Sequence, residues 1–365
     1  PVEFHITTDA VVMGGYYNRV PVVTHFSLLT KKSRILPGLL NESGDLDQIK
    51  TYPDGSFDVI IAAKNYRGQK TMWIKNYDAN GELLRNLALD PEENKSLIFA
   101  RSLKTTDNVQ IIAGVFGSRN SEFSRGLFIA TLDPSGLQQL RYYNFGDLEN
   151  FFKYMKVKRE QRVRERIERR KIKGKKTRFS YRFLVHEIVP HNNQYILLGE
   201  AFSPQYKSID RGYGSFFTPY GLSGTRIQNG QIFDGYHYTH AVVIGFDPDG
   251  NIIWDNSFEI NDVKTYTLEQ FVKLEIRGDK IILLYLFENM LRSKIINGNE
   301  VLEGKNIESL KLNAPTDIAV KENDKNSRLE YWYRDFFYAH GIQEISNAAS
   351  GKRRVQYITK LSYRE

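Results

Sequence analysis

The densest group of side chains that could do chemistry is a basic segment in the middle of the chain. Between residues 153 and 182 the sequence holds 15 Lys or Arg and three Glu, whereas the remainder is mildly acidic. Charge of this density attracts phosphate, anionic lipid headgroups or an acidic protein. The segment predicts a helix over 147–178, capped by Asp147, inside a basic helical insertion at 146–180.

We expect a basic arm along this helix, and the residues assigned to it are Arg159, Arg162, Arg166, Arg169, Arg170, Lys173, Lys175 and Lys176. The alternative is a solvated helix in which Glu160, Glu165 and Glu168 pair with arginines at helical spacing. The arm predicts a possible contact with an anionic surface. Nucleic acid is not the favoured partner, because the positive charge is confined to this one segment.

A second unusual segment, 203–239, alternates aromatic residues with glycines. Flat rings on glycine-rich loops give a large contact area at a low cost in entropy, which is typical of partner-binding surfaces. The sequence predicts an aromatic, Gly-rich loop whose partner-binding residues are Tyr206, Tyr213, Phe216, Phe217, Tyr220, Phe233, Tyr236 and Tyr238. The alternative is a loop that packs its rings on itself.

Residues suited to catalysis or metal binding are few. Cys is absent, which excludes disulfides and thiolate chemistry, and no nucleophile or phosphate-loop motif occurs. His237 and His240 would point to opposite faces of a strand, so we predict no metal site and no cofactor. Carboxylate pairs for glycoside chemistry remain an alternative, with Asp210, Asp234 and Glu200 as the first candidates.

The sequence predicts that a repeated β-hairpin positions these residues. Three segments, 71–89, 126–144 and 241–258, each consist of two alternating apolar runs joined by Asp-x-x-Gly. The Asp carboxylate accepts backbone N–H bonds across such a turn, and Gly adopts the positive φ that the turn requires. The turns therefore need no functional explanation.

A nearly continuous apolar strand precedes each hairpin, and it recurs six times at 9–18, 56–65, 108–117, 193–202, 279–288 and 334–343. The pattern predicts an all-β protein: one six-bladed β-propeller domain over 1–365, built of four-stranded antiparallel blades, with the two segments above as insertions. Two β-sandwich or meander domains are the alternative.

The repeat resembles bacterial propellers of the quinoprotein-like and TolB-like kind, and Gly250-Asn-Ile-Ile-Trp254 is similar to the docking motif of quinoprotein blades. Only one copy carries the Trp, so quinone binding does not carry over. The resemblance implies an exported protein that works in an envelope assembly, including outer-membrane secretion machinery.

These observations lead to one main hypothesis, a non-catalytic docking or scaffold subunit whose partner is a protein, such as an envelope or membrane-protein complex. We expect it in the periplasm or at the cell surface, although no signal peptide is visible and no apolar run is long enough to span a bilayer. The alternatives are an anion-binding protein that uses the basic helix, for nucleic acid or acidic membrane, and a glycan-binding or glycan-active propeller.

Overall fold

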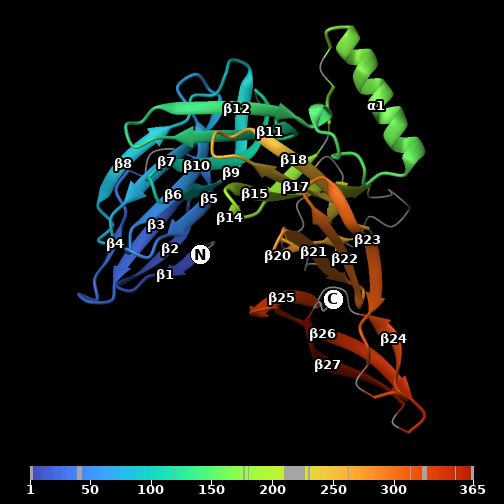
Figure 1. Ribbon diagram of the computed structural model, residues 1–365. Coiled ribbons are helices and arrows are strands. Elements are labelled where there is room, and N and C mark those ends of the chain that lie inside the picture. Colours follow the sequence, from blue (N-terminus) through green and yellow to red (C-terminus); the bar gives the residue numbers. More distant parts are fainter. Residues whose placement is uncertain are drawn as a thin grey trace, which may run out of the picture. The chain divides into compact units, whose positions relative to one another are not determined.

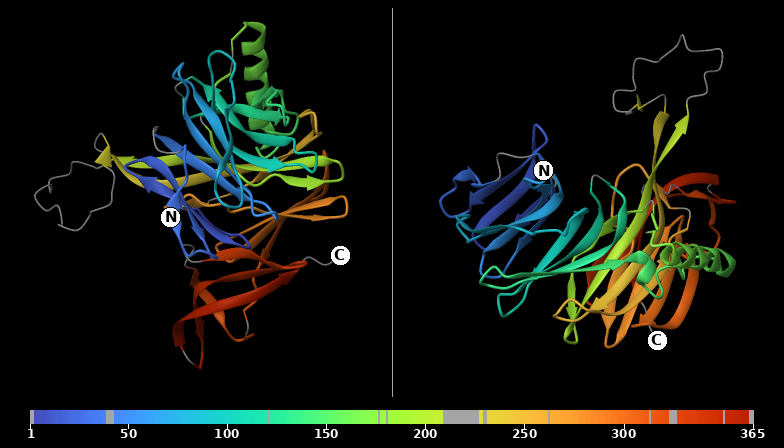
Figure 2. Two further views of the ribbon diagram at one scale, coloured as in Figure 1. Left: turned by 90° about the vertical axis from the view of Figure 1, so that its left-hand side faces the viewer. Right: turned by 90° about the horizontal axis from the view of Figure 1, so that it is seen from above.

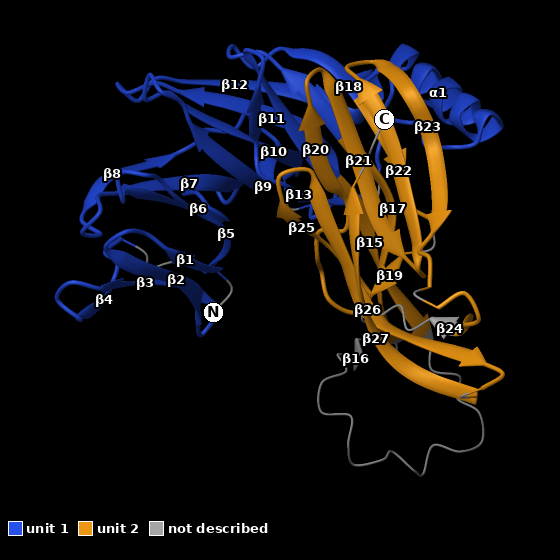
Figure 3. Cartoon of the chain, turned by 60° about the horizontal axis from the view of Figure 1, so that its bottom comes forward, with its two compact units in different colours: residues 1–199, 243–255 blue, residues 200–242, 256–365 orange. Residues whose placement is uncertain are grey.

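The computed structural model describes residues 3–38, 43–119, 121–175, 177–179, 181–208, 227–228, 231–261, 263–312, 314–322, 327–349 and 351–362. The chain divides into two compact units, residues 1–199 with 243–255 and residues 200–242 with 256–365 (Figure 3). Each unit is described by itself below.

The regular secondary structure of the described residues is nearly all antiparallel β-sheet, as the repeat predicts, and the strands form six sheets (Figure 1). Three four-stranded sheets lie in the first unit, and each runs in chain order. The first contains β1 (Glu3–Ile6), β2 (Ala10–Tyr17), β3 (Val20–Ser27) and β4 (Ser33–Ile35). The second contains β5 (Gly44–Thr51), β6 (Phe57–Lys64), β7 (Lys70–Tyr77) and β8 (Leu83–Ala88). The third contains β9 (Lys95–Lys104), β10 (Gln110–Ser118), β11 (Ser124–Leu132) and β12 (Gln138–Asn144).

The strands of the first sheet (blue in Figure 2) run side by side as one twisted antiparallel layer in both views. Inside the second sheet, β6 is buried along seven of its eight residues. Burying the side chains of Val59, Ile60 and Ile61 contributes about 1.5–3 kcal/mol each. A continuous apolar run of this kind is what a strand buried on both faces requires.

The fourth sheet contributes strands to both units: β13 (Arg182–Val185), β14 (Val189–His191), β15 (Gln194–Ser208), β16 (Ile227–Gln228), β17 (Gln231–Phe246), β18 (Ile252–Glu259) and β19 (Lys264–Thr265). The last two sheets lie in the second unit. One contains β20 (Lys273–Arg277), β21 (Lys280–Phe287), β22 (Met290–Asn297) and β23 (Glu300–Ser309). The other contains β24 (Ile318–Glu322), β25 (Arg328–Tyr333), β26 (Phe336–Asn347) and β27 (Gly351–Ser362), with β24 and β25 paired to different stretches of β26.

The Asp-x-x-Gly turns have the predicted chemistry. The Asp78 carboxylate accepts the amides of Asn80 and Glu82 at 2.9 and 2.7 Å, and the φ of Gly81 is +78°. The corresponding φ values of Gly136 and Gly250 are +98° and +80°. Only a residue without a Cβ adopts these values cheaply, so the glycines are explained by the backbone alone.

Trp254 packs on the backbone of the neighbouring strand. Its Nε1 donates to the Gln194 side chain at 2.8 Å, and a Cβ built on Gly245 would lie 2.2 Å from its ring. Gly245 therefore leaves the space that the indole fills. This packing gives Trp254 a structural role within the sheet.

The basic helix is shorter than predicted. Residues 145–147 form a short 3-10 helix, η1 (Phe145–Asp147), and α1 spans Val157–Ile172. Asp147 is therefore not its cap; Lys156 occupies that position and makes no side-chain capping bond. Between the two helices the chain makes turns, because the buried Asp255 carboxylate accepts the amides of Glu149 and Asn150 at 3.0 and 2.8 Å.

The end of α1 follows from Gly174, whose φ is +62°. The amide of Gly174 donates to the carbonyl of Lys171 at 2.9 Å, and that of Lys175 donates to the carbonyl of Arg170 at 2.8 Å. This pair of bonds is the Schellman motif that closes a helix. The three basic residues of the last turn also complement the helix dipole, which accounts for part of the local charge.

The aromatic segment differs from the predicted loop at both ends, because β15 continues to Ser208 and β17 begins at Gln231. The sequence pattern missed these extensions because glycine and polar residues interrupt the apolar alternation there. Residues 209–226 and 229–230 lie outside the described residues.

Candidate functional site

A cluster of charged and polar side chains in the first unit lies on the edge strands β1, β5 and β9 and on the segment that follows β13. We call it the first-strand cluster, and its members are Glu3, His5, Asp47, Gln48, Lys50, Arg101 and Glu187. Each comes from the first strand of a sheet or directly follows one. The cluster thus joins four parts of the chain that are far apart in the sequence.

A β-bulge places two of these residues. The register of β5 against β6 shifts between Leu46 and Gln48, so Asp47 is the extra residue. A bulge bends a strand and turns its side chains in a new direction. Here the Asp47 carboxylate accepts the amide of Ala100 at 3.0 Å, and the Gln48 carbonyl oxygen accepts the amide of Ser102 at 2.7 Å. Side chains of β5 therefore accept hydrogen bonds from backbone amides at the edge of β9.

Glu187 is the most exposed carboxylate of the cluster, with 47% of its side chain accessible. The amide nitrogen of Gln48 donates to both of its oxygens at 2.9 and 2.8 Å, and the Lys50 ammonium lies 2.8 Å from Oε2. Charge-assisted hydrogen bonds of this kind fix a carboxylate in one orientation. Glu187 is thus held in one orientation at the surface of the cluster.

Arg101 links Glu187 to the first strand of the chain. Its guanidinium lies 3.8 Å from Glu187 and 4.0 Å from Glu3, and its Nε donates to the carbonyl of Val185 at 3.2 Å. Glu3 in turn contacts Nε2 of His5 at 2.8 Å. Imidazole is the side-chain group that most often transfers protons in acid–base catalysis.

Asp47 differs from Glu187 in its burial. Its side chain is only 3% exposed. Burial raises the pKa of Asp47 to about 8, although the Ala100 amide and the charges of Lys70 and Arg101 act in the opposite direction. Burial thus favours the protonated form of Asp47. A carboxyl group with a shifted pKa inside a polar cluster is a common feature of acid–base sites.

The carboxylates proposed from the sequence occupy other roles. Glu200 is fully buried and accepts the amides of Phe271 and Val272 at 3.1 and 3.0 Å. Asp234 lies between Lys264 at 2.5 Å and Lys207 at 3.1 Å, and the hydrogen bond from Lys264 lowers its pKa. Asp210 lies outside the described residues. Glu200 and Asp234 belong to the second unit, whereas the first-strand cluster belongs to the first.

The histidine pair also has a structural explanation. His240 is fully buried, with Nδ1 at 2.9 Å from the Thr239 hydroxyl, and burial lowers its pKa to about 3. Within the described part of the chain, no group of three or more His, Asp or Glu side chains could hold a metal ion.

The predicted partner-binding aromatics separate into three groups. Tyr213, Phe216, Phe217 and Tyr220 lie outside the described residues. Tyr238 is fully buried and donates its hydroxyl to the carbonyl of Glu269 at 2.7 Å, so it belongs to the core. Tyr206, Phe233 and Tyr236 form a chain of edge-on ring contacts, and 44% of Tyr206 is exposed.

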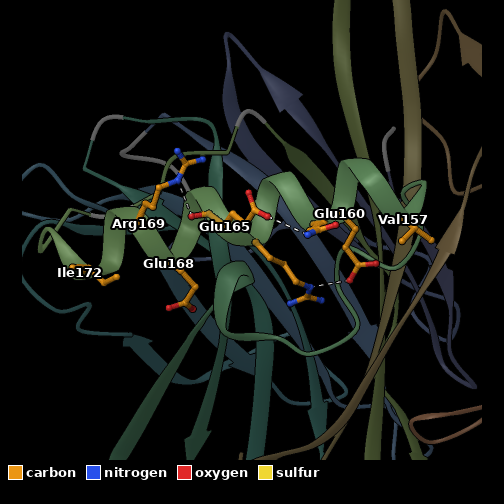
Figure 4. Close-up of a pocket in the computed structure, with 8 residues that line it drawn as sticks. Val157, Glu160, Glu165, Glu168, Arg169 and Ile172 are labelled. Carbon is orange, nitrogen blue, oxygen red and sulfur yellow. Dashed lines mark hydrogen bonds and ion pairs between the residues drawn. The ribbon is translucent and has the colours of Figure 1, made fainter.

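The basic arm has two different faces. A groove of about 790 Å³ runs along one of them, where Arg164 pairs with Glu160 at 2.8 Å and Gln161 bonds to Glu165 (Figure 4). On the adjacent face, Arg159, Arg162 and Arg166 follow each other at spacings of three and four residues and are exposed. Among the described residues Arg162 and Arg166 have no carboxylate partner.

The remaining arm residues lie elsewhere. Arg169 donates to the carbonyl of Glu165 and lines the groove, and Arg170 is half-buried. Lys173 is the C-cap residue, Lys175 follows the helix, and Lys176 lies outside the described residues. Among the described residues no helix is both long and apolar enough to span a membrane.

No family model matches the chain, and neither does any curated protein. Solved structures do match over most of its length. A prolyl endopeptidase is 10% identical with a TM-score of 0.41; the match covers 99% of this chain, which spans 42% of that enzyme. An ulvan lyase of polysaccharide lyase family 25 is 8% identical with a TM-score of 0.43, over 98% of this chain and 78% of the lyase. The β-propeller domain of the trilobed protease from Pyrococcus furiosus is 9% identical with a TM-score of 0.31, over 96% of each chain.

The neighbours thus include β-propeller proteins, and they correct the functional hypothesis. The expectation of a non-catalytic docking subunit is wrong, because the neighbours are mainly enzymes: polysaccharide lyases, an endo-arabinanase, an exo-β-1,3-galactanase and a prolyl endopeptidase. At TM-scores below 0.5 they carry no argument for a particular activity of this chain. A bacterial, exported origin gains no support from them either.

Proposed function

We propose that this protein is an enzyme that cleaves a polysaccharide at the first-strand cluster. The observation that carries the proposal is the Glu187 carboxylate, which is half-exposed, held at both oxygens by Gln48 and Lys50, and close to Arg101. A carboxylate that is anchored in a polar cluster built from four strands or loops is the arrangement that general-base chemistry needs.

Several members of the cluster have a role in this reaction. Glu187 takes a proton from the attacking water, and the His5 side chain gives one to the oxygen that leaves as the glycosidic bond breaks. Lys50 and Arg101 provide positive charge for an acidic sugar. Asp47 acts as a positioning residue, because its hydrogen bond to β9 fixes the bulge that directs Gln48 toward Glu187.

The test is turnover on a panel of neutral and acidic polysaccharides, followed by release of reducing ends. We expect Glu187→Gln to lower kcat by about 10²–10⁴-fold. Glu122→Gln is the matched control, since Glu122 is exposed and pairs only with Arg182 in the described structure. Full activity of Glu187→Gln, or no turnover on any polymer of the panel, would refute the proposal.

The arginine face of α1 supports a second function, the binding of a linear polyanion. Arg159, Arg162 and Arg166 form a cationic stripe that lacks neutralising carboxylates at Arg162 and Arg166. Replacing all three with Gln should weaken binding to heparin and reduce the dependence of the affinity on salt. A variant with Arg164, Arg169 and Arg170 changed to Gln removes the same charge. Equal loss in both variants would argue against a specific face.

We also propose that the six sheets are the blades of one six-bladed propeller. Support comes from the sheets at each end of the chain, each of which exposes large apolar side chains: Phe4 and Ile6 on β1, and Trp332 and Tyr333 on β25. A ring gives every blade two neighbours. Small-angle scattering should give a radius of gyration of about 21 Å for a closed, compact chain of this length. A clearly larger radius would contradict ring closure.

A further inference from the structure

A cavity of about 450 Å³ in the first unit is distinct from both the first-strand cluster and the arginine face. Its walls come from β9 and the residues just before it, from β10, β11 and the end of β12, from η1 and from the second half of α1. Gly174, Lys175, Thr177 and Phe179 complete them. A volume of this size is typical of small-molecule sites.

One side of the cavity is apolar. Phe116, Ile167 and Phe179 line it. Ile167 is the buried residue of α1, and it packs on Gly146, where an added Cβ would lie 3.3 Å from its side chain. Phe179 is held in place by rings of the turns below α1, with centroids 5.5 Å from Phe152 and 6.3 Å from Phe145. This wall is therefore rigid and suited to an apolar ligand.

Charged residues also line the cavity, and the positive charges among them are unequally compensated. Lys95 pairs with Glu92 at 2.5 Å and lies 3.6 Å from the centre of the Tyr142 ring. Lys171 lies 4.0 Å from Asp147. Of the remaining lining charges, Arg125 and Lys175 are positive and the exposed Glu93 is negative.

Arg125 is the least compensated charge. It is half-buried, and within the described structure it has no ion pair or hydrogen bond through its side chain. A backbone bond of 2.8 Å from Ser124 to Tyr181 holds β11 beside the segment that carries Arg178. Burial and the like charge of Arg178 lower the pKa of the Arg125 guanidinium. A bound anion would relieve both unfavourable effects, because it supplies the missing opposite charge.

We propose that this cavity binds a small organic carboxylate, with its carboxylate on Arg125 and its apolar part against Phe116, Ile167 and Phe179. The guanidinium fork matches a carboxylate in a bidentate manner, which gives direction as well as affinity. Lys175 adds positive charge at the mouth. This site is a property of the chain that does not depend on the proposed glycan cleavage.

The test is isothermal titration of the whole protein with benzoate, and with benzamide as a neutral molecule of the same shape. We expect benzoate to bind and benzamide to bind at least about tenfold more weakly. Arg125→Gln should weaken benzoate binding by at least about tenfold. Arg162→Gln removes the same charge from the outer face of α1 and should leave the affinity unchanged within about twofold.

Circular dichroism of the unliganded Arg125→Gln variant verifies that it folds. If it does not, Arg125→Lys takes its place, since it keeps the charge but loses the fork, and an intermediate loss of affinity is expected. Equal binding of benzoate and benzamide, equal losses in the Arg125 and Arg162 variants, or no benzoate binding to the wild type would each overturn the proposal. Retained binding in Glu187→Gln separates this site from the proposed active site.

Discussion

Replacing Asp47 with Asn removes a buried carboxyl group while keeping its shape and its oxygen acceptor for the Ala100 amide. Because burial raises the pKa of Asp47 to about 8, the folded protein keeps a proton that the unfolded chain releases above its ordinary pKa of 3.8. The wild type therefore loses stability as pH rises from about 4 through 8. Asp47→Asn has no titratable proton at this position, so the pH-dependent loss of stability is absent from the variant.

The magnitude follows from proton linkage. One proton held only by the folded state changes the free energy of unfolding by about 1.4 kcal/mol per pH unit. Between pH 5 and pH 7 the folded carboxyl is protonated and the unfolded one is ionised. The difference in stability between Asp47→Asn and wild type should thus shift by roughly 2.7 kcal/mol in favour of the variant.

The assay is urea unfolding at pH 5, 6 and 7, followed by the fluorescence of the three tryptophans, of which Trp73 lies on β7 of the same sheet as Asp47. Asp133→Asn is the control. Hydrogen bonding by Ser135 lowers the pKa of the exposed Asp133, so this carboxylate is ionised in both the folded and the unfolded protein throughout this pH range. Its difference from wild type should not change with pH. A pH-independent difference for Asp47→Asn would mean that Asp47 is ionised in the folded protein.

Two further predictions concern packing. Gly245→Ala should destabilise the protein by about 1–3 kcal/mol, because its Cβ would lie 2.2 Å from the Trp254 ring. The control is Gly304→Ala, whose Cβ meets no atom within 4 Å. Thermal unfolding compares the two variants, and equal melting temperatures would contradict the prediction. Tyr238→Phe should lower the free energy of unfolding by about 1 kcal/mol, since it removes the hydroxyl that bonds to both the carbonyl and the amide of Glu269. Tyr206→Phe, at an exposed ring, should leave it almost unchanged. Urea unfolding measures both variants, and a larger loss of stability at Tyr206 would contradict the prediction.

The bounds of the basic helix show which features a local sequence pattern does not predict. The predicted end at residue 178 lies beyond the end of α1 at Ile172, where the positive φ of Gly174 closes the helix. The start was wrong by ten residues, since Asp147 appeared to be a good cap. The predicted first turns of the helix do not form, because the amides of Glu149 and Asn150 donate to Asp255, which is more than a hundred residues away in the sequence. No local pattern records such a contact.

The first-strand cluster was missed for a related reason. Asp47, Gln48 and Glu187 look like ordinary polar residues at strand ends, and no spacing connects them. A signal was present in Leu46-Asp47-Gln48-Ile49, where two polar residues interrupt the alternation and mark the bulge. That signal locates a bulge without indicating what the side chains meet.

The sequence by itself determined the local geometry of this protein: the repeated hairpins, their Asp-x-x-Gly turns, the nearly all-β character and the concentration of positive charge. These depend on alternation and turn chemistry within about ten residues, where each residue acts on its neighbours. Only the tertiary structure decided which edge strands meet, and with them the partners of Glu187, the burial that favours the protonated form of Asp47 and the uncompensated charge of Arg125. Burial and electrostatic pairing depend on chain segments that are distant in sequence, so they exist only once the strands have assembled.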